Sequence, residues 1–175
     1  MKLDKRMFKF SAGFTLLEFL VYLGIVSVVL IMAGAVGLNI MFRKAKLTAI
    51  KEVSQNARLV SETIAATVRN AQVIISPVVG NNAPALSLQM ADAAQNPTVF
   101  DLSGGVVRIK KGLGSPVNLT AGQVEAVNLN FVNVSYPQTP GTIKMQAVIR
   151  FLNPSGRPEY NWEVPIFTTI NIRKK

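Results

Sequence analysis

The sequence contains no cysteine and no histidine among its 175 residues. Disulfide bonds, thiol chemistry, histidine bases and most zinc sites are therefore excluded. Acidic residues are also scarce, nine against 19 basic ones. No segment clusters the several oxygen ligands that a calcium site requires, and no glycine-rich segment ends in the Gly-Lys-Ser/Thr of a phosphate-binding loop. We therefore expect a protein that is not an enzyme, with no catalytic residues, no metal and no cofactor.

A long and largely apolar run is the main feature that the sequence does contain. It covers residues 10–42, and its only charged residue is Glu18. An ionised carboxylate in a bilayer core is costly, so an acid within a membrane-spanning segment is a candidate functional residue. Residues 14–42 would form a helix of about 44 Å, longer than the hydrocarbon core of about 30 Å. Both flanks are basic, so charge alone does not give the orientation.

The segment around this carboxylate has a distinct layout. Residues 1–9 carry four basic residues and one acidic residue, and a small residue then opens the sequence Gly13-Phe14-Thr15-Leu16-Leu17-Glu18. This layout closely resembles the signal of the type IV prepilins. That family includes the type IV pilins, the pseudopilins of type II secretion and the competence pseudopilins of DNA uptake. Ordinary secretory signals differ, because their apolar segment precedes the cleavage site and is discarded.

The resemblance implies that a prepilin peptidase cuts between Gly13 and Phe14, on the cytoplasmic side, and methylates the new amine. Glycine suits a cleavage site because it lacks a Cβ and allows close approach to the backbone. The leader, residues 1–13, would be removed, and residues 14–42 would remain as a transmembrane and polymerisation helix. The implied location is the bacterial cytoplasmic membrane, with the N-terminus inside, and later a filament outside the cytoplasm.

The resemblance also implies an assembly role for Glu18, which would pair with the amino group of Phe14 on a neighbouring subunit. A buried carboxylate left without its partner is strongly destabilising, so this pair would set the axial register of subunits. The alternative is that Glu18 reaches toward headgroups and has no assembly role. The implied partners are prepilin peptidase, other pilin or pseudopilin subunits, an inner-membrane platform protein, an assembly ATPase, and membrane lipid before assembly.

The helix is expected to continue beyond the apolar run. Apolar residues recur at spacings of three and four, which predicts an amphipathic helix with one apolar stripe; they are Leu47, Ile50, Val53, Ala57, Val60, Ile64, Val68 and Ala71. Proline cannot continue a helix, so Ser76-Pro77 predicts its end. We expect one continuous helix over residues 14–75, of which residues 43–75 form the amphipathic half.

Two glycines, Gly34 and Gly37, interrupt the second half of the apolar run. Each costs about 1 kcal/mol relative to alanine inside a helix, so the helix would loosen first at this point. One interpretation is a segment that melts as subunits leave the bilayer and pack into a filament. The other is close packing between helices at small residues.

The remaining residues, 76–175, predict a β-rich globular domain. Residues 143–151 alternate between apolar and polar, which is typical of a strand with one buried face. Strands are expected at 86–90, 98–102, 105–109, 124–136, 142–152 and 159–172, with Pro165 at a sheet edge or a bulge. An antiparallel sheet packed on the helix stripe would give an α+β fold, the pilin-like architecture.

These features favour a structural filament subunit. Many major pilins close a C-terminal loop with a disulfide, which this chain cannot do, so a minor pilin or pseudopilin, similar to the J or W types, is the favoured member of the family. The net charge of +10 allows a second interpretation. Arg108, Lys110 and Lys111 could contact a polyanion, with DNA the plausible cargo of a competence pseudopilin, although we favour a role in solubility. A third interpretation is a single-pass anchored domain that never polymerises.

Overall fold

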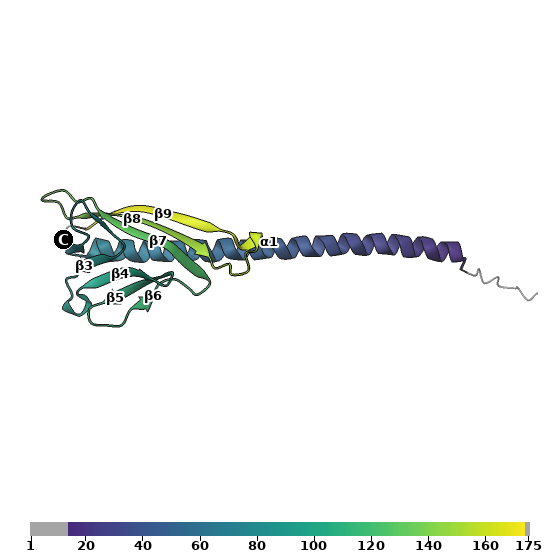
Figure 1. Cartoon of the computed structure of the whole chain (residues 1–175), viewed down its shortest axis with the longest axis horizontal. Coiled ribbons are helices and arrows are strands. Elements are labelled where there is room, and N and C mark those ends of the chain that lie inside the picture. The colour runs from purple at the N-terminus through teal and green to yellow at the C-terminus, as the bar shows by residue number, and fades with distance from the viewer. Residues whose placement is uncertain (1–13, 174–175) are drawn as a thin grey trace, which may run out of the picture. The chain divides into compact units, whose positions relative to one another are not determined.

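A computed structural model describes residues 14–173 of the chain (Figure 1). The chain divides into two compact units, Met1–Phe42 and Arg43–Lys175. The helix α1, Leu16–Asn70, contributes residues to both units. Each unit is described separately below.

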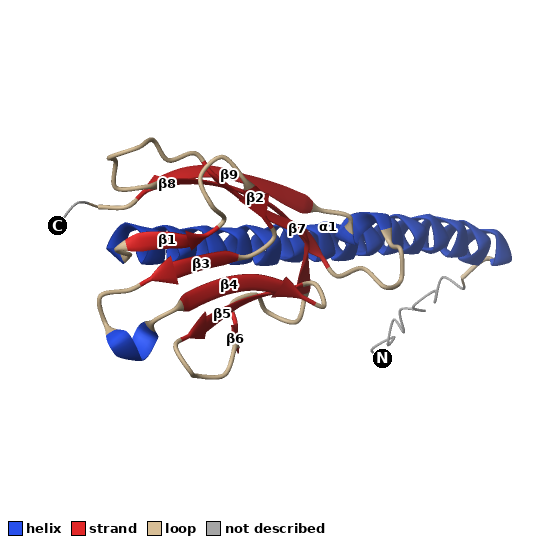
Figure 2. Ribbon diagram, turned by 60° about the vertical axis from the view of Figure 1, so that its left-hand side comes forward, coloured by secondary structure: helices blue, strands red, loops and turns tan. Residues whose placement is uncertain are grey.

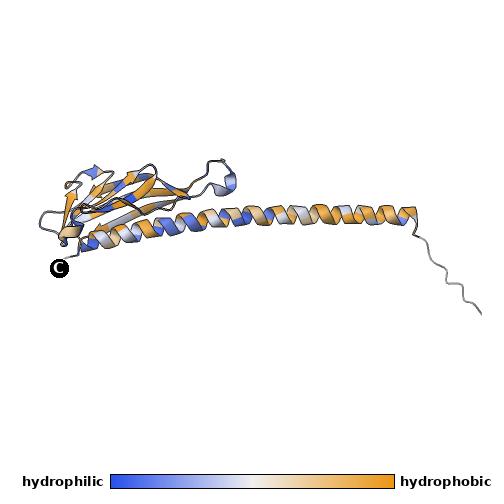
Figure 3. Cartoon of the chain, turned by 90° about the horizontal axis from the view of Figure 1, so that it is seen from below, coloured by the Kyte–Doolittle hydropathy of each residue, from blue (hydrophilic) through white to orange (hydrophobic). Residues whose placement is uncertain are grey.

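In the first unit, the described residues are almost entirely helix. Every residue from Phe14 to Phe42 is exposed, and Figure 3 shows this part of α1 coloured mostly as hydrophobic. The helix is long and apolar enough to cross a membrane, and no residue of its most apolar stretch is buried within the chain. An apolar surface of this kind requires lipid or another protein around it.

In the second unit, the rest of α1 forms the spine of an α+β domain. The predicted stripe is buried from Val53 to Val68, with Ala71 buried just past the helix end. Leu47, expected at the start of the stripe, is instead exposed. The buried helix residues are Ala49, Val53, Asn56, Ala57, Val60, Ile64, Ala65 and Val68.

The expected end of the helix at residue 75 is wrong, because α1 ends at Asn70. The backbone N–H of Gln72 donates to the carbonyl of Gln89 at 2.8 Å instead of continuing the helix. The next residues form strand β1, Val73–Ser76, whose Val-Ile-Ile sequence has a high strand propensity. The amphipathic half of the helix is therefore five residues shorter than predicted.

The strands form two antiparallel sheets in place of the single sheet expected (Figure 2). The first has the order β1-β3-β4-β5-β6 and adds β3 (Leu86–Gln89), β4 (Thr98–Ser103), β5 (Val106–Lys111) and β6 (Val117–Asn118). The second has the order β2-β7-β8-β9, from β2 (Asn82–Ala83), β7 (Val124–Asn133), β8 (Thr142–Phe151) and β9 (Glu163–Asn171). Short 3₁₀ turns occur at Ala93–Gln95 and Pro158–Tyr160.

A single hydrophobic core joins the helix to both sheets. Ile64 on α1, Phe100 on β4 and Phe131 on β7 are all fully buried in one cluster. The predicted alternation of β8 is confirmed, since Ile143 and Met145 are buried on one face. The α+β class and the pilin-like architecture, a long N-terminal helix followed by antiparallel sheet, are therefore confirmed.

The last strand also differs from its prediction at one end. The segment expected as strand from residue 159 begins pairing only at Glu163, because Pro158–Tyr160 forms a 3₁₀ turn. Pro165 lies on β9, which pairs with β8 and is the outermost strand of its sheet. Its expected place at a sheet edge is therefore confirmed, since an edge strand tolerates a missing N–H donor.

Two buried asparagines hold loops against the core through side-chain hydrogen bonds, a role that the sequence did not indicate. Asn56 donates its amide N–H to the carbonyl of Glu52 and accepts the N–H of Ala121, both at 2.9 Å. Asn133 donates to the carbonyl of Pro77 at 2.7 Å. Buried amides that meet their hydrogen-bonding capacity stabilise one loop arrangement over others.

Gly112, which follows β5, gives a prediction for stability. Its φ is +52°, and a Cβ built there would lie 2.3 Å from the carbonyl oxygen of Ala94. Gly112→Ala should therefore lower the free energy of unfolding by about 1–3 kcal/mol, measured by urea unfolding of the full chain in detergent. Gly122→Ala is the control, because its added Cβ would have no heavy atom within 4 Å apart from those of Gly122 itself and its two chain neighbours. Equal stabilities of the two variants would contradict the proposed clash.

Candidate functional site

The start of α1 carries a helix cap that includes Glu18. The backbone N–H of Glu18 donates to Oγ1 of Thr15 at 3.3 Å, and the N–H of Phe19 donates to the Thr15 carbonyl at 3.1 Å. Thr15 therefore caps the helix: its hydroxyl satisfies the N–H of Glu18, which has no partner within the helix, and its carbonyl accepts the first helical bond. The spacing Thr-x-x-Glu is a capping-box pattern, a signal that our sequence interpretation did not use.

The side chain of Glu18 contacts Tyr22, one turn further along the helix. The Tyr22 hydroxyl donates to Oε1 of Glu18 at 3.4 Å. The ring of Tyr22 also lies against the ring of Phe14, with centroids 5.5 Å apart and an angle of 37° between the planes. The structure thus brings together Phe14 and Glu18, the two predicted assembly residues, through a third residue that the sequence interpretation missed. The i, i+4 spacing of Glu18 and Tyr22 could have indicated this contact.

Two other polar side chains of the apolar run bond to their own helix. Ser27 Oγ donates to the carbonyl of Leu23 at 2.7 Å, and Asn39 Nδ2 donates to the carbonyl of Ala35 at 3.0 Å. These bonds satisfy polar groups without water, as a lipid environment requires. Glu18 differs, because a carboxylate cannot donate to a helix carbonyl.

The remaining residues predicted for processing and melting are placed as follows. Gly13 lies outside the described residues, while Phe14 lies two residues before Leu16, the first residue of the helix. Gly34 and Gly37 both lie inside α1, and a Cβ at either would meet no other atom within 4 Å. A shallow apolar hollow, lined in part by Ala33, Val36 and Gly37, marks the helix surface there. This hollow could accept a side chain of a neighbouring helix, as close packing would require.

The three basic residues predicted to contact a polyanion all lie on β5, but they do not form one basic face. Two guanidinium nitrogens of Arg108, Nε and Nη2, donate to the carboxylate of Asp101 on β4, at 2.9 and 2.8 Å. This hydrogen bonding raises the pKa of Arg108 above its ordinary value. Lys110 and Lys111 are exposed and, as neighbours on a strand, point to opposite faces. The engagement of Arg108 with Asp101 favours a structural role for that residue.

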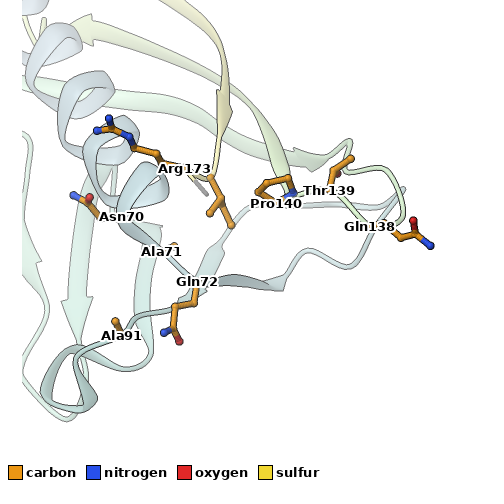
Figure 4. Close-up of a pocket in the computed structure, with 9 residues that line it drawn as sticks. Asn70, Ala71, Gln72, Ala91, Gln138, Thr139, Pro140 and Arg173 are labelled. Atoms are coloured by element: carbon orange, nitrogen blue, oxygen red, sulfur yellow. The ribbon is translucent and has the colours of Figure 1, made fainter. Parts of the chain in front are cut away.

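An open hollow of about 500 Å³ lies at the end of α1 (Figure 4). Asn70, Ala71 and Gln72 line it from the helix end, and Gln138, Thr139 and Pro140 line it from the β7–β8 loop. Among the described residues that line the hollow, Arg173 is charged and none has a side-chain carboxylate. Over residues 14–173, no three acidic side chains gather where they could hold a metal ion. The described residues of the hollow therefore offer hydrogen-bonding groups and one guanidinium.

Comparisons of the chain with protein-family models, with curated proteins and with solved structures find no match. The features that bear on function are therefore the residues around Glu18, the exposed apolar part of α1 and the part of α1 that has a buried stripe.

Proposed function

We propose that the chain is a structural subunit, a minor pilin or pseudopilin, of a type IV pilus-like or type II secretion filament. The observation that carries the proposal is the sequence from Gly13 to Glu18, whose last three residues begin one helix with two kinds of surface. From Phe14 to Phe42 this helix is exposed and apolar, and beyond it the same helix is the spine of an α+β domain. This combination suits a subunit that is first anchored in lipid and then packed through its N-terminal helix.

Before assembly, the length of the apolar run would place Glu18 near the cytoplasmic surface of the membrane. Beyond the apolar run, basic residues resume at Arg43, so Phe42 marks the outer limit of the apolar segment. A hydrocarbon core of about 30 Å takes about 20 residues, which corresponds to residues 23–42. Glu18 and Tyr22 would then lie at headgroup level, where water can reach the carboxylate and where tyrosine is favoured.

During assembly, the same residues would enter the filament interior. Residues 14–42 would pack against the helices of neighbouring subunits, and Glu18 would leave water and pair with the methylated amine of Phe14 on a neighbour. Because an unpaired buried charge is strongly destabilising, only the matching register would be stable. Processing by prepilin peptidase, a platform protein and an assembly ATPase would be required. The alternatives are a DNA-uptake pseudopilin and an anchored domain that does not polymerise.

The test of this proposal is the mass and N-terminal sequence of the membrane-extracted protein, with and without a co-expressed prepilin peptidase. The expected product lacks residues 1–13 and carries one added methyl group on Phe14. A Gly13→Val variant should stay uncut, because the branched side chain hinders the close approach that glycine allows. A leader that remains intact in the wild-type chain under both conditions would contradict the proposal and favour the anchored domain.

A further inference from the structure

Tyr22 is placed to act on Glu18 because of helix geometry. Side chains on a helix lean toward its N-terminus, so a residue at i+4 covers the residue at i. The Tyr22 hydroxyl lies 3.4 Å from Oε1 of Glu18, longer than the usual hydroxyl–carboxylate bond of about 2.7 Å. This weak contact engages Oε1, and none of the residues that the structure describes donates to Oε2.

Tyr22 is also placed to act on Phe14. Phe14 precedes the first helical residue, Leu16, so helix hydrogen bonds do not fix its conformation. Its ring instead lies against the ring of Tyr22, at 5.5 Å between centroids. Tilted aromatic pairs at this separation are attractive beyond their buried area. One side chain thus contacts both residues that the proposed filament joins between neighbouring subunits.

We propose that Tyr22 is a positioning residue for assembly: within each subunit its hydroxyl orients the Glu18 carboxylate and its ring orients Phe14. This inference rests on the proposed function. Fixing the two groups before subunits meet lowers the conformational entropy lost on docking. As Glu18 leaves water, the hydroxyl also keeps one of its oxygens hydrogen-bonded, which reduces the cost of burying the charge. The tyrosine would therefore make assembly more favourable without itself contacting the neighbouring subunit's amine.

A spectroscopic experiment tests the contact in the unassembled subunit. The chain contains three tyrosines, Tyr22, Tyr136 and Tyr160, so tyrosine labelled with ¹³C at Cζ gives three NMR signals in lipid nanodiscs. Glu18→Ala should shift the Tyr22 signal, because its hydroxyl loses the carboxylate acceptor, and should leave the other two unchanged. A Tyr22 signal that does not move in Glu18→Ala would overturn the proposal.

An assembly experiment tests the consequence, using a host that carries the filament machinery. Tyr22→Phe keeps the ring and removes only the hydroxyl, and should lower incorporation into filaments about two- to tenfold, the range expected for one lost hydrogen bond. Tyr22→Leu removes the ring as well and should lower it further. Tyr136→Phe, at an exposed tyrosine outside the helix, is the matched control and should assemble normally.

A double variant separates positioning from a merely structural role. If Tyr22 acts through Glu18, Tyr22→Phe should cause no further loss in a Glu18→Ala background. Additive losses, or normal assembly of Tyr22→Phe beside a depleted Glu18→Ala, would overturn the role of Tyr22 and leave the filament function standing. Normal assembly of Glu18→Ala itself would overturn both the register argument and the inference that rests on it.

Discussion

Replacing Phe131 with alanine should lower the free energy of unfolding of the β-rich domain by about 3–5 kcal/mol. Phe131 lies on β7, is fully buried, and belongs to the cluster that also contains Ile64 of the helix. Its removal takes away apolar contact and leaves a cavity that the close-packed surroundings fill only in part. A loss of this size is a large share of the 5–15 kcal/mol that is typical of a whole domain.

The same substitution at Phe167 gives a matched control. Phe167 lies on β9 of the same sheet but is 68% exposed, so Phe167→Ala should change the free energy of unfolding by about 0.5 kcal/mol or less. Both variants can be followed by urea unfolding of the full chain in detergent micelles, with the fluorescence of Trp162, the single tryptophan, as the signal. Equal losses at the two positions would contradict the core described here.

Periodicity explains why so much of the fold could be predicted from the sequence. The stripe from Val53 to Val68 has helical spacing, and the buried face of β8 has the period of two that a strand imposes. Each pattern shows which side of a helix or strand faces the core, so it predicts both the type of element and its buried face. The glycine pair Gly104-Gly105 separates β4 from β5, and residues 153–158, which contain two prolines and a glycine, lie between β8 and β9.

Other parts of the fold carry no such pattern. The strands β2 and β6 have two residues each, too few for any period. The helix end was misplaced because Val73–Ser76 is apolar enough to extend a helical pattern, and only its pairing with β3 reveals a strand. The division into two sheets depends on which strands pair over long distances, which local sequence does not encode. The polar side chain of Asn56 gives no sequence signal of burial, which is explained by the hydrogen bond it accepts from the N–H of Ala121.

Part of the candidate site also stands out as a local sequence pattern, and part of it does not. Phe14 and Glu18 lie in a segment that resembles the prepilin signal, so their residue types and spacing single them out as candidates. Thr15 and Tyr22 contact Glu18, and these contacts depend on where helix α1 starts and how its side chains lean. The spacings Thr-x-x-Glu and i, i+4 indicate such contacts only where the start of the helix is also known.

Glu18→Ala should leave cleavage after Gly13 intact but deplete the protein from filaments by at least about tenfold. In the proposed filament the carboxylate neutralises the amine of Phe14 on a neighbouring subunit, and removing it leaves that amine buried without a partner. Breaking one side of a buried ion pair typically costs about 3–5 kcal/mol, so the expected loss is large. The measurement is the ratio of filament-associated to membrane-associated protein, with the N-terminal mass confirming that processing is unchanged.

Two further variants decide whether charge is the cause. Glu18→Gln keeps the size of the side chain and should be depleted nearly as strongly, because a neutral amide does not balance the amine. Glu62→Ala removes a different acid of the same helix, one that pairs with Arg58 at 2.7 Å on an exposed surface; such pairs contribute little, so this variant should assemble normally. Normal incorporation of both Glu18 variants would contradict the register argument. It would then favour a role for Glu18 at the headgroup level alone, where a carboxylate in water needs no partner subunit.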